Sequence, residues 1–284
     1  MTYRECYEQG CRTLQAAGIE EAALDARLLL EAVCGTDRND LLVHGEQPVA
    51  PEAEEKYLNW IRQRAEHIPL QQLTGEQGFM GLTFSVNEHV LIPRQDTEIL
   101  VEEVLKELHD GMRVLDMCTG SGCILLSLLH YSNDCEGLGV DLSAEALEVA
   151  GRNVLKVLTP EKAEHAHFLQ SDLFEKVEGK FEIIVSNPPY IASAEVDRLM
   201  PEVRDHEPRM ALDGTEDGLY FYRRIIEEAG KHLVSSGMLF FEIGYDQGQA
   251  VSELMRTEGY CEVQVVQDYA GLDRVVLGTY CERN

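Results

Sequence analysis

The chain has 284 residues, of which 44% are hydrophobic, and it carries a formal net charge of −27 at pH 7. A chain of this length and composition can bury a sizeable core and is long enough for one large and one small domain. Its acidity argues against a surface that holds nucleic acid by neutralising phosphates. The first residues lack the apolar run of a signal peptide, and no later stretch approaches a membrane span, so we expect a cytoplasmic protein.

The eight cysteines have no repeated spacing along the chain. A reducing compartment would leave them as thiols, which is what we expect here. Cys118 and Cys123 lie close together, but a zinc site needs more ligands than the neighbouring sequence offers. We therefore predict no metal site.

Residues 1–75 carry apolar side chains at helical spacing, and Leu24, Leu28 and Leu29 form one such set. Pro51 and the glutamates behind it have the form of a helix start. These patterns predict a small helical domain. Such a domain can either pack as a cap on a larger one or grip a partner, and we assign it substrate recognition.

Residues 76–93 are a predicted linker, because two short strand-like runs flank Gly81 and suggest a hairpin. Residues 94–284 then alternate between helices and strands, which predicts an α/β fold. We expect helices between the first five strands and none between the last two. The sheet should therefore be seven-stranded, mostly parallel and doubly wound, with an antiparallel hairpin at its edge. The predicted strands are 112–117, 136–141, 166–170, 181–186, 237–243, 260–267 and 273–280.

A glycine-rich turn follows the first of these strands. Glycines allow the backbone to approach a ligand closely and to present amide groups at the start of a helix. A dinucleotide fingerprint would need a third glycine at position 125, where Leu125 stands, so an NAD site is disfavoured. The candidate loop residues are Thr119, Gly120, Ser121, Gly122 and Cys123.

Acidic residues follow three successive strands, at Asp116, Asp141 and Asp172. Asp141 can accept both hydroxyls of a ribose, and Asp172 can accept from an adenine amino group. Asp141 could instead cap the following helix, a role that Ser143 also suits. Because the carboxyl ends of parallel strands meet at one edge of a sheet, the three acids and the glycine loop together predict a nucleoside site.

The fourth strand ends at Asn187, Pro188, Pro189 and Tyr190, where the two prolines force the backbone out of the sheet. The Asn187 side-chain oxygen and the Pro188 carbonyl can each accept one N–H of a planar nitrogen and so aim its lone pair. The nitrogen becomes positive as a new bond forms, both acceptors then bind it more tightly, and no separate base is needed. Tyr190 would pack on the plane of the target amide or form a wall of the pocket; alternatively, it is an aromatic residue of the core.

With these motifs the chain resembles the class I S-adenosylmethionine-dependent methyltransferases, which have a Rossmann-like fold. Within that class it resembles the release factor glutamine N5-methyltransferases, the PrmC or HemK family. The resemblance covers nearly the whole length and includes residues 92–98, 207–208, 211–214, 217–219 and 241–244. It implies an enzyme that methylates the glutamine of the Gly-Gly-Gln motif in peptide chain release factors.

The resemblance also implies residue roles. The loop at 119–123 and Asp141 bind S-adenosylmethionine, and residues 187–190 hold the substrate glutamine. We assign Asp116, Asp172, Leu173 and Asn187 to the same cofactor site. Three positions depart from the family pattern: Cys118 replaces a glycine, Gln95 replaces a proline, and Leu173 replaces a tryptophan that meets the adenine.

Residues before the first sheet strand are also candidates for the site. We expect Arg94 at its mouth, in contact with the substrate, together with Thr97 and Glu98. Thr97 and Glu98 equally suit a first-turn helix cap. Glu242 stands in an apolar strand, either as a paired buried acid or as a wall of the site.

Three other functions stay open at this point. Methyltransferases of the exocyclic amines of nucleobases share the tetrapeptide, but they need a basic track that a net charge of −27 does not supply. A glutamine methyltransferase that acts on a ribosomal protein shares both the chemistry and the motifs. A non-catalytic scaffold would require decay of the glycine loop or the tetrapeptide, and both are intact.

Overall fold

The computed structural model describes residues 1–281 and divides the chain into two compact units. The smaller unit comprises Met1–Glu76 together with Met200–His206, and the larger comprises Gln77–Leu199 and the chain from Glu207 onward. The last three residues of the predicted methyltransferase domain, 282–284, lie outside the described residues. No helix in the described part of the chain is long and apolar enough to cross a membrane.

The smaller unit is a helical bundle with a core of its own. Thr2 caps the first helix through a capping box with Glu5, which satisfies two backbone N–H groups at the helix start. Tyr57 lies at the centre of the core and donates its hydroxyl to the carbonyl of Ala26 at 3.2 Å. The helices are α1 (Tyr3–Ala16), α2 (Ala22–Cys34), α3 (Arg38–Val43), α4 (Pro51–Ala65) and α5 (Leu70–Thr74).

A buried ion cluster ties the late segment Met200–His206 into this unit. The Arg64 guanidinium donates to Asp25 at 2.7 Å and to Glu202, from helix α11 (Pro201–Arg204), at 3.1 Å. His67 Nδ1 lies 2.9 Å from the same Glu202 oxygen. Arg64 and Asp25 are both buried, so each ion depends on its partners to offset the loss of hydration.

Arg64→Ala is therefore expected to lower the free energy of unfolding by about 3–5 kcal/mol, because it leaves Asp25 buried without its cation. The chain's single tryptophan, Trp60, lies one turn earlier on α4 and reports unfolding of this unit by its fluorescence in urea. Arg12→Ala, which removes an exposed pair with Glu8, serves as the control and should change stability by less than about 1 kcal/mol. Equal shifts for both variants would contradict the structural role of the cluster.

The larger unit is built on a seven-stranded sheet with the order β5-β4-β3-β6-β7-β9-β8, which confirms the predicted fold class. The first five strands of that order are parallel, and β9 runs antiparallel to both β7 and β8. A separate two-stranded sheet pairs β1 (Glu76–Phe79) with β2 (Leu82–Ser85). The main strands are β3 (Arg113–Met117), β4 (Glu136–Asp141), β5 (Ala166–Gln170), β6 (Phe181–Ser186), β7 (Leu233–Glu242), β8 (Tyr260–Gln267) and β9 (Asp273–Tyr280).

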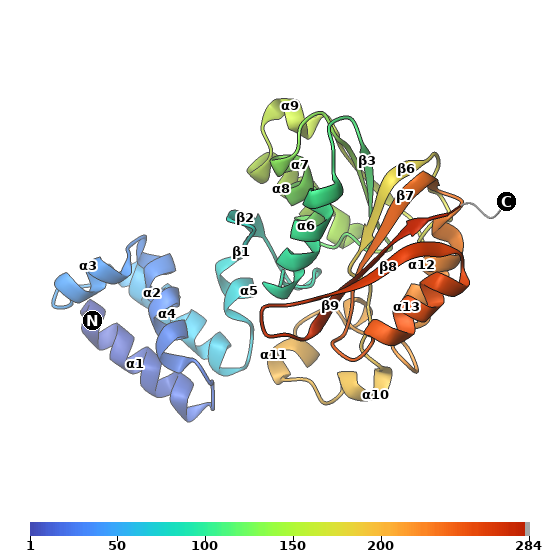
Figure 1. Ribbon diagram of the computed structural model, residues 1–284. Helices are drawn as coiled ribbons and strands as arrows, with labels where there is room; N and C mark the ends of the chain where they lie inside the picture. The colour runs from blue at the N-terminus through green and yellow to red at the C-terminus, as the bar shows by residue number, and fades with distance from the viewer. Residues whose placement is uncertain (282–284) are drawn as a thin grey trace. The chain divides into compact units, whose positions relative to one another are not determined.

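Helices cover both faces of this sheet (Figure 1). Val114 of β3 packs in the core beneath α6, α7 and α8, whereas Leu115 and Met117 pack in the core beneath α12 and α13. The alternation follows from the two-residue period of a strand. The helices of this unit are α6 (Asp96–Glu107), α7 (Cys123–Tyr131), α8 (Ala144–Val157), α9 (Pro160–Ala163), α10 (Ser193–Val196), η1 (Arg209–Ala211), α12 (Tyr220–Ala229) and α13 (Gly248–Thr257).

Two expectations were wrong. No helix joins β5 to β6, because the short connection 171–180 is used for turns, with Leu173 and Gly179 at positive φ. Cys261 and Cys281 form a disulfide, so the expectation of thiols fails for this pair. Their spacing along the chain gave no sign of it, because only the pairing of β8 with β9 brings their Cα atoms within 6.0 Å.

Candidate active site

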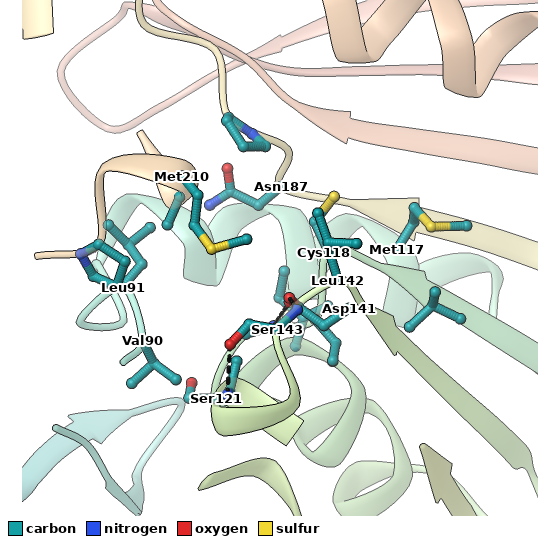
Figure 2. Close-up of a pocket in the computed structure, with 18 of the residues that line it drawn as sticks. Val90, Leu91, Met117, Cys118, Ser121, Asp141, Leu142, Ser143, Asn187 and Met210 are labelled. Carbon is teal, nitrogen blue, oxygen red and sulfur yellow. Dashed lines mark hydrogen bonds between the residues drawn. The ribbon is translucent and has the colours of Figure 1, made fainter. Parts of the chain in front are cut away.

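A cavity of about 320 Å³ opens in the larger unit where β3, β4 and β6 end. Figure 2 shows Cys118, Asp141, Asn187 and Met210 grouped around it. This is the position in which open α/β sheets bind their ligands. The predicted site residues that line the cavity are Arg94, Thr97, Thr119, Gly120, Ser121, Cys123, Asp141, Asp172, Leu173, Asn187 and Pro189.

The glycine loop runs from β3 into α7 through three residues at positive φ. These are Cys118 at 63°, Gly120 at 55° and Gly122 at 77°. Cys118, which is not a glycine, adopts this left-handed conformation at a cost of about 1–2 kcal/mol. Gly139 of β4 leaves room for the loop, because a Cβ atom there would lie 3.0 Å from the Thr119 hydroxyl, and the Thr119 N–H donates to the Val140 carbonyl of β4 at 3.0 Å. The loop is thus held close to β4 by local backbone geometry.

Asp141 holds this loop and also faces the cavity. One carboxylate oxygen accepts from the backbone N–H of Gly120 at 2.8 Å, and the other accepts from that of Ser143 at 2.9 Å. Burial raises the pKa of Asp141, against the effect of these hydrogen bonds. Each oxygen keeps a second lone pair, so the carboxylate can still accept two hydroxyls from a ligand.

Asp116 lies behind the loop and does not line the cavity. It is fully buried and accepts from the Thr119 hydroxyl at 2.6 Å and from the backbone N–H of Leu125 at 3.3 Å. Burial raises the pKa of Asp116 to about 7. These contacts anchor the loop and the first turn of α7, and Gly122, likewise absent from the cavity lining, is the N-cap residue of α7.

Asp172 and Leu173 border the cavity at the end of β5. Asp172 accepts from Arg224 of α12 at 2.9 Å, so one carboxylate oxygen already has a cationic partner. Leu173 is nearly buried and lines the cavity from a left-handed backbone conformation. It supplies an apolar surface to the cavity.

The tetrapeptide divides between the cavity and the core. Asn187 and Pro189 line the cavity, whereas Pro188 and Tyr190 do not. The Asn187 amide nitrogen donates to the Thr97 hydroxyl at 3.3 Å. Tyr190 packs against the core beneath α12 and α13 and donates its hydroxyl to Glu242 at 3.3 Å. Asn187 is therefore the polar side chain of this segment that reaches the cavity.

Arg94 lies at the cavity wall and forms an ion pair with Glu207. Glu207 also accepts from the backbone N–H of Ile92 at 3.1 Å and is almost completely buried. Burial raises the pKa of Glu207, while Arg94 opposes that rise. The pair connects two of the family-like segments across the wall of the cavity.

Several lining residues were not singled out by the sequence analysis. They include Val90 and Leu91 before α6, Leu142 after β4, and Met210 in η1. These side chains are apolar and lie outside the periodic patterns of strands and helices, so no spacing rule marks them. Gln247 was also missed, although its side chain donates to the Tyr190 carbonyl at 3.0 Å and so holds the end of the tetrapeptide.

The cavity combines an apolar lining with oxygen acceptors from Asp141 and Asn187. Among residues 1–281, no group of three or more His, Cys, Asp or Glu side chains is placed to hold a metal ion. The site offers one carboxylate suited to a diol and one carboxamide suited to an N–H group. It can therefore bind a nucleoside and orient a nitrogen beside it.

Two family models match the chain. Residues 5–75 match the model of the PrmC N-terminal domain, and residues 94–203 match that of the methyltransferase small domain. A methyltransferase from Pyrococcus furiosus has a similar fold, with a TM-score of 0.52 at 18% identity over 72% of this chain and 92% of that one. That similarity concerns the fold alone.

Relatives of nearly equal length identify the family to which the chain belongs. A release factor glutamine methyltransferase from Moorella thermoacetica is 43% identical over 281 residues, which is 98% of each chain. One from Agrobacterium fabrum is 40% identical over 271 residues, which is 93% of each chain. With a methyltransferase fold and an acceptor site at the strand ends, this chain belongs to the release factor glutamine methyltransferases and is a protein-glutamine N5-methyltransferase.

Proposed function

We propose that this enzyme transfers a methyl group from S-adenosylmethionine to the side-chain amide nitrogen of the glutamine in the Gly-Gly-Gln motif of peptide chain release factors. The observation that carries the proposal is the Asn187 carboxamide at a cavity that also contains the Asp141 carboxylate and the glycine loop. The names of the relatives support the substrate. Release factors act in the cytoplasm, where we place the enzyme.

The residues present fit S-adenosylmethionine. Asp141 retains acceptor capacity for the two ribose hydroxyls, and Leu173 offers an apolar surface for the adenine. We assign Asp172 to the adenine amino group and the loop from Thr119 to Cys123 to the remaining contacts. When bound, the cofactor supplies a methyl carbon on a sulfonium sulfur, which accepts the electron pair of the broken C–S bond.

The protein's part in the reaction is to orient the target amide. Its nitrogen is a poor nucleophile because its lone pair is delocalised into the carbonyl. In the proposed arrangement the Asn187 oxygen and the Pro188 carbonyl accept its two N–H groups, Pro189 and Arg94 line the substrate site, and Tyr190 supports it from the core. The acceptors bind the nitrogen more tightly as it becomes positive, which lowers the barrier. The methylated nitrogen then releases one of its protons to water and returns to a neutral amide.

We also propose that residues 1–75 recognise the protein substrate, that 76–93 link the two parts, and that 94–284 carry out catalysis. The separate core of the helical unit supports the first assignment, as does the match of residues 5–75 to a domain model of this family. A ribosomal protein is the alternative substrate, because the same amide chemistry would serve it. No direct contact with nucleic acid is expected at a net charge of −27.

The expected result with radiolabelled S-adenosylmethionine is label on a release factor with an intact Gly-Gly-Gln motif, and none when that glutamine is changed to alanine. The loss follows because alanine has no amide nitrogen to accept the methyl group. Ribosomal protein and tRNA, incubated in parallel, should stay unlabelled. Label on both forms of the release factor, or on neither, would contradict the proposal.

A further inference from the structure

Four side chains form a polar path that leads from the cavity wall inward: Asn187 and Thr97 line the cavity, whereas Glu242 and Tyr190 lie behind it. The Asn187 amide nitrogen donates to the Thr97 hydroxyl at 3.3 Å, and the Tyr190 hydroxyl donates to Glu242 Oε1 at 3.3 Å. The Thr97 hydroxyl also faces the Glu242 carboxylate, where as a donor it opposes the rise of the pKa of that group. The path joins α6, the end of β6 and the end of β7.

The middle of this path is buried, so the hydrogen bonds there decide which orientations are allowed. Thr97 is 3% exposed and Glu242 is 2% exposed. Glu242 Oε2 has no hydrogen-bond partner among the described residues, which makes the contacts of Oε1 more important to the carboxylate. Glu242 is buried and does not line the cavity, so its role cannot be direct contact with the substrate.

The hydroxyl of Thr97 has only one proton to give. An ionised Glu242 can only accept, so it takes that proton, and the hydroxyl oxygen can then only accept from Asn187. A carboxamide has a donor end and an acceptor end of nearly the same shape, and packing alone does not choose between them. The Thr97 hydroxyl selects one orientation of the carboxamide, because its oxygen accepts from the amide nitrogen and leaves the side-chain oxygen free to bind the substrate.

We propose that Thr97 and Glu242 are positioning residues that fix the rotation of the Asn187 carboxamide, so that its oxygen faces the target amide. The inference rests on the proposed acceptor role of Asn187. Thr97 acts directly on the carboxamide, and Glu242 acts through Thr97. Tyr190 supplies a second donor to Glu242 and so favours the ionised form that the arrangement requires.

The arrangement predicts a pH dependence of turnover. Burial raises the pKa of Glu242 to about 6, against the opposing effects of Thr97, Arg274 and Tyr190. Below that pH the protonated carboxyl can donate to Thr97, whose own proton then turns toward Asn187 and favours the reversed carboxamide. The kcat should therefore fall as the pH falls through about 6. The titratable or charged groups that face Glu242 from the packed elements are Asp96, Cys123, Tyr190, Tyr222 and Arg274.

Asp116 titrates in a neighbouring range, with a pKa of about 7, but it lies under the cofactor loop. Its protonation should change cofactor affinity rather than the orientation of Asn187. Measuring kcat with both substrates saturating removes that contribution from the profile. The fall of kcat at acid pH that remains, which we call the acid limb, then reports the protonation of Glu242.

Thr97→Val and Thr97→Ser form a matched pair for the kinetic test, because valine keeps the shape and serine keeps the hydroxyl. With a release factor as substrate, we expect Thr97→Val to lower kcat about tenfold, to leave cofactor affinity within about twofold, and to abolish the acid limb. Thr97→Ser should restore both kcat and the limb. An unchanged kcat in Thr97→Val, an equal loss in Thr97→Ser, or a limb that persists in Thr97→Val would each overturn the proposal.

A second measurement needs no substrate. The side-chain amide resonances of Asn187 in the full ¹⁵N-labelled enzyme, assigned by their loss in Asn187→Ala, should shift with an apparent pKa near 6. The shift should be absent in Thr97→Val and in Glu242→Gln, and present in Thr97→Ser. A shift that survives in both of the first two variants would overturn the inference. If the titration behaves as expected while the wild-type enzyme methylates no release factor, the proposed substrate fails and the positioning role stands.

Discussion

Replacing Asn187 with alanine is expected to lower kcat by about 10²- to 10³-fold, with the dissociation constant of S-adenosylmethionine within about threefold of the wild-type value. The side-chain oxygen binds the target nitrogen more tightly as that nitrogen becomes positive, so its loss acts on the transition state. The cofactor keeps Asp141 and the glycine loop, which Asn187 does not contact through any hydrogen bond of the described residues.

Single-turnover kinetics with a release factor and calorimetric titration with the cofactor separate the two effects. Asn133→Ala is the matched control, because this asparagine is exposed in the connection between α7 and β4. It should leave both kcat and cofactor affinity unchanged. If Asn187→Ala weakens cofactor binding as much as it slows turnover, the residue acts in the cofactor site and the acceptor role is wrong.

Asp141→Ala should weaken the binding of S-adenosylmethionine by about 10²-fold or more. A hydrogen bond to a charged group contributes about 1.5–3 kcal/mol, and the variant loses two proposed bonds to the ribose. It also releases the backbone N–H groups of Gly120 and Ser143, which hold the cofactor loop. Calorimetry on the purified full chain measures the change directly.

Asp141→Asn separates the contributions of shape and of acceptor capacity. The asparagine keeps one acceptor oxygen and places an NH₂ group where the second oxygen was, so it should cost less than alanine, about tenfold. A dissociation constant that is unaltered in Asp141→Ala would show that Asp141 only caps the loop. In that case the ribose would have to be bound by another part of the cavity.

The strands and their polar ends could be read from the sequence. Runs such as residues 181–186 are apolar and β-branched over a strand's length, and a residue that ends a parallel strand must lie at the ligand-binding edge. That reasoning placed Asp141 and Asn187 correctly at one cavity. It could not separate Asp116 from them, because whether a strand-end carboxylate faces the cavity or the loop depends on the turn that follows.

Contacts between distant parts of the chain were beyond the same reasoning. The sequence allowed two roles each for Thr97 and Glu242. The structure places Thr97 beside Asn187 at the cavity wall and Glu242 behind Thr97. The disulfide between Cys261 and Cys281 likewise depends on which strands are neighbours. Local propensity carries no information about that order.

The amino-acid sequence by itself determined the type of fold, the family pattern and the polar groups at the strand ends, because these follow from periodicity and from residue chemistry at fixed spacing. Only the tertiary structure decided which of those groups reach the cavity and which support them. Tyr190 turned inward to Glu242, and Thr97 turned toward Asn187. The physical reason is that a hydrogen bond requires two atoms within about 3.5 Å, and the packing of α6, β6 and β7 sets those distances.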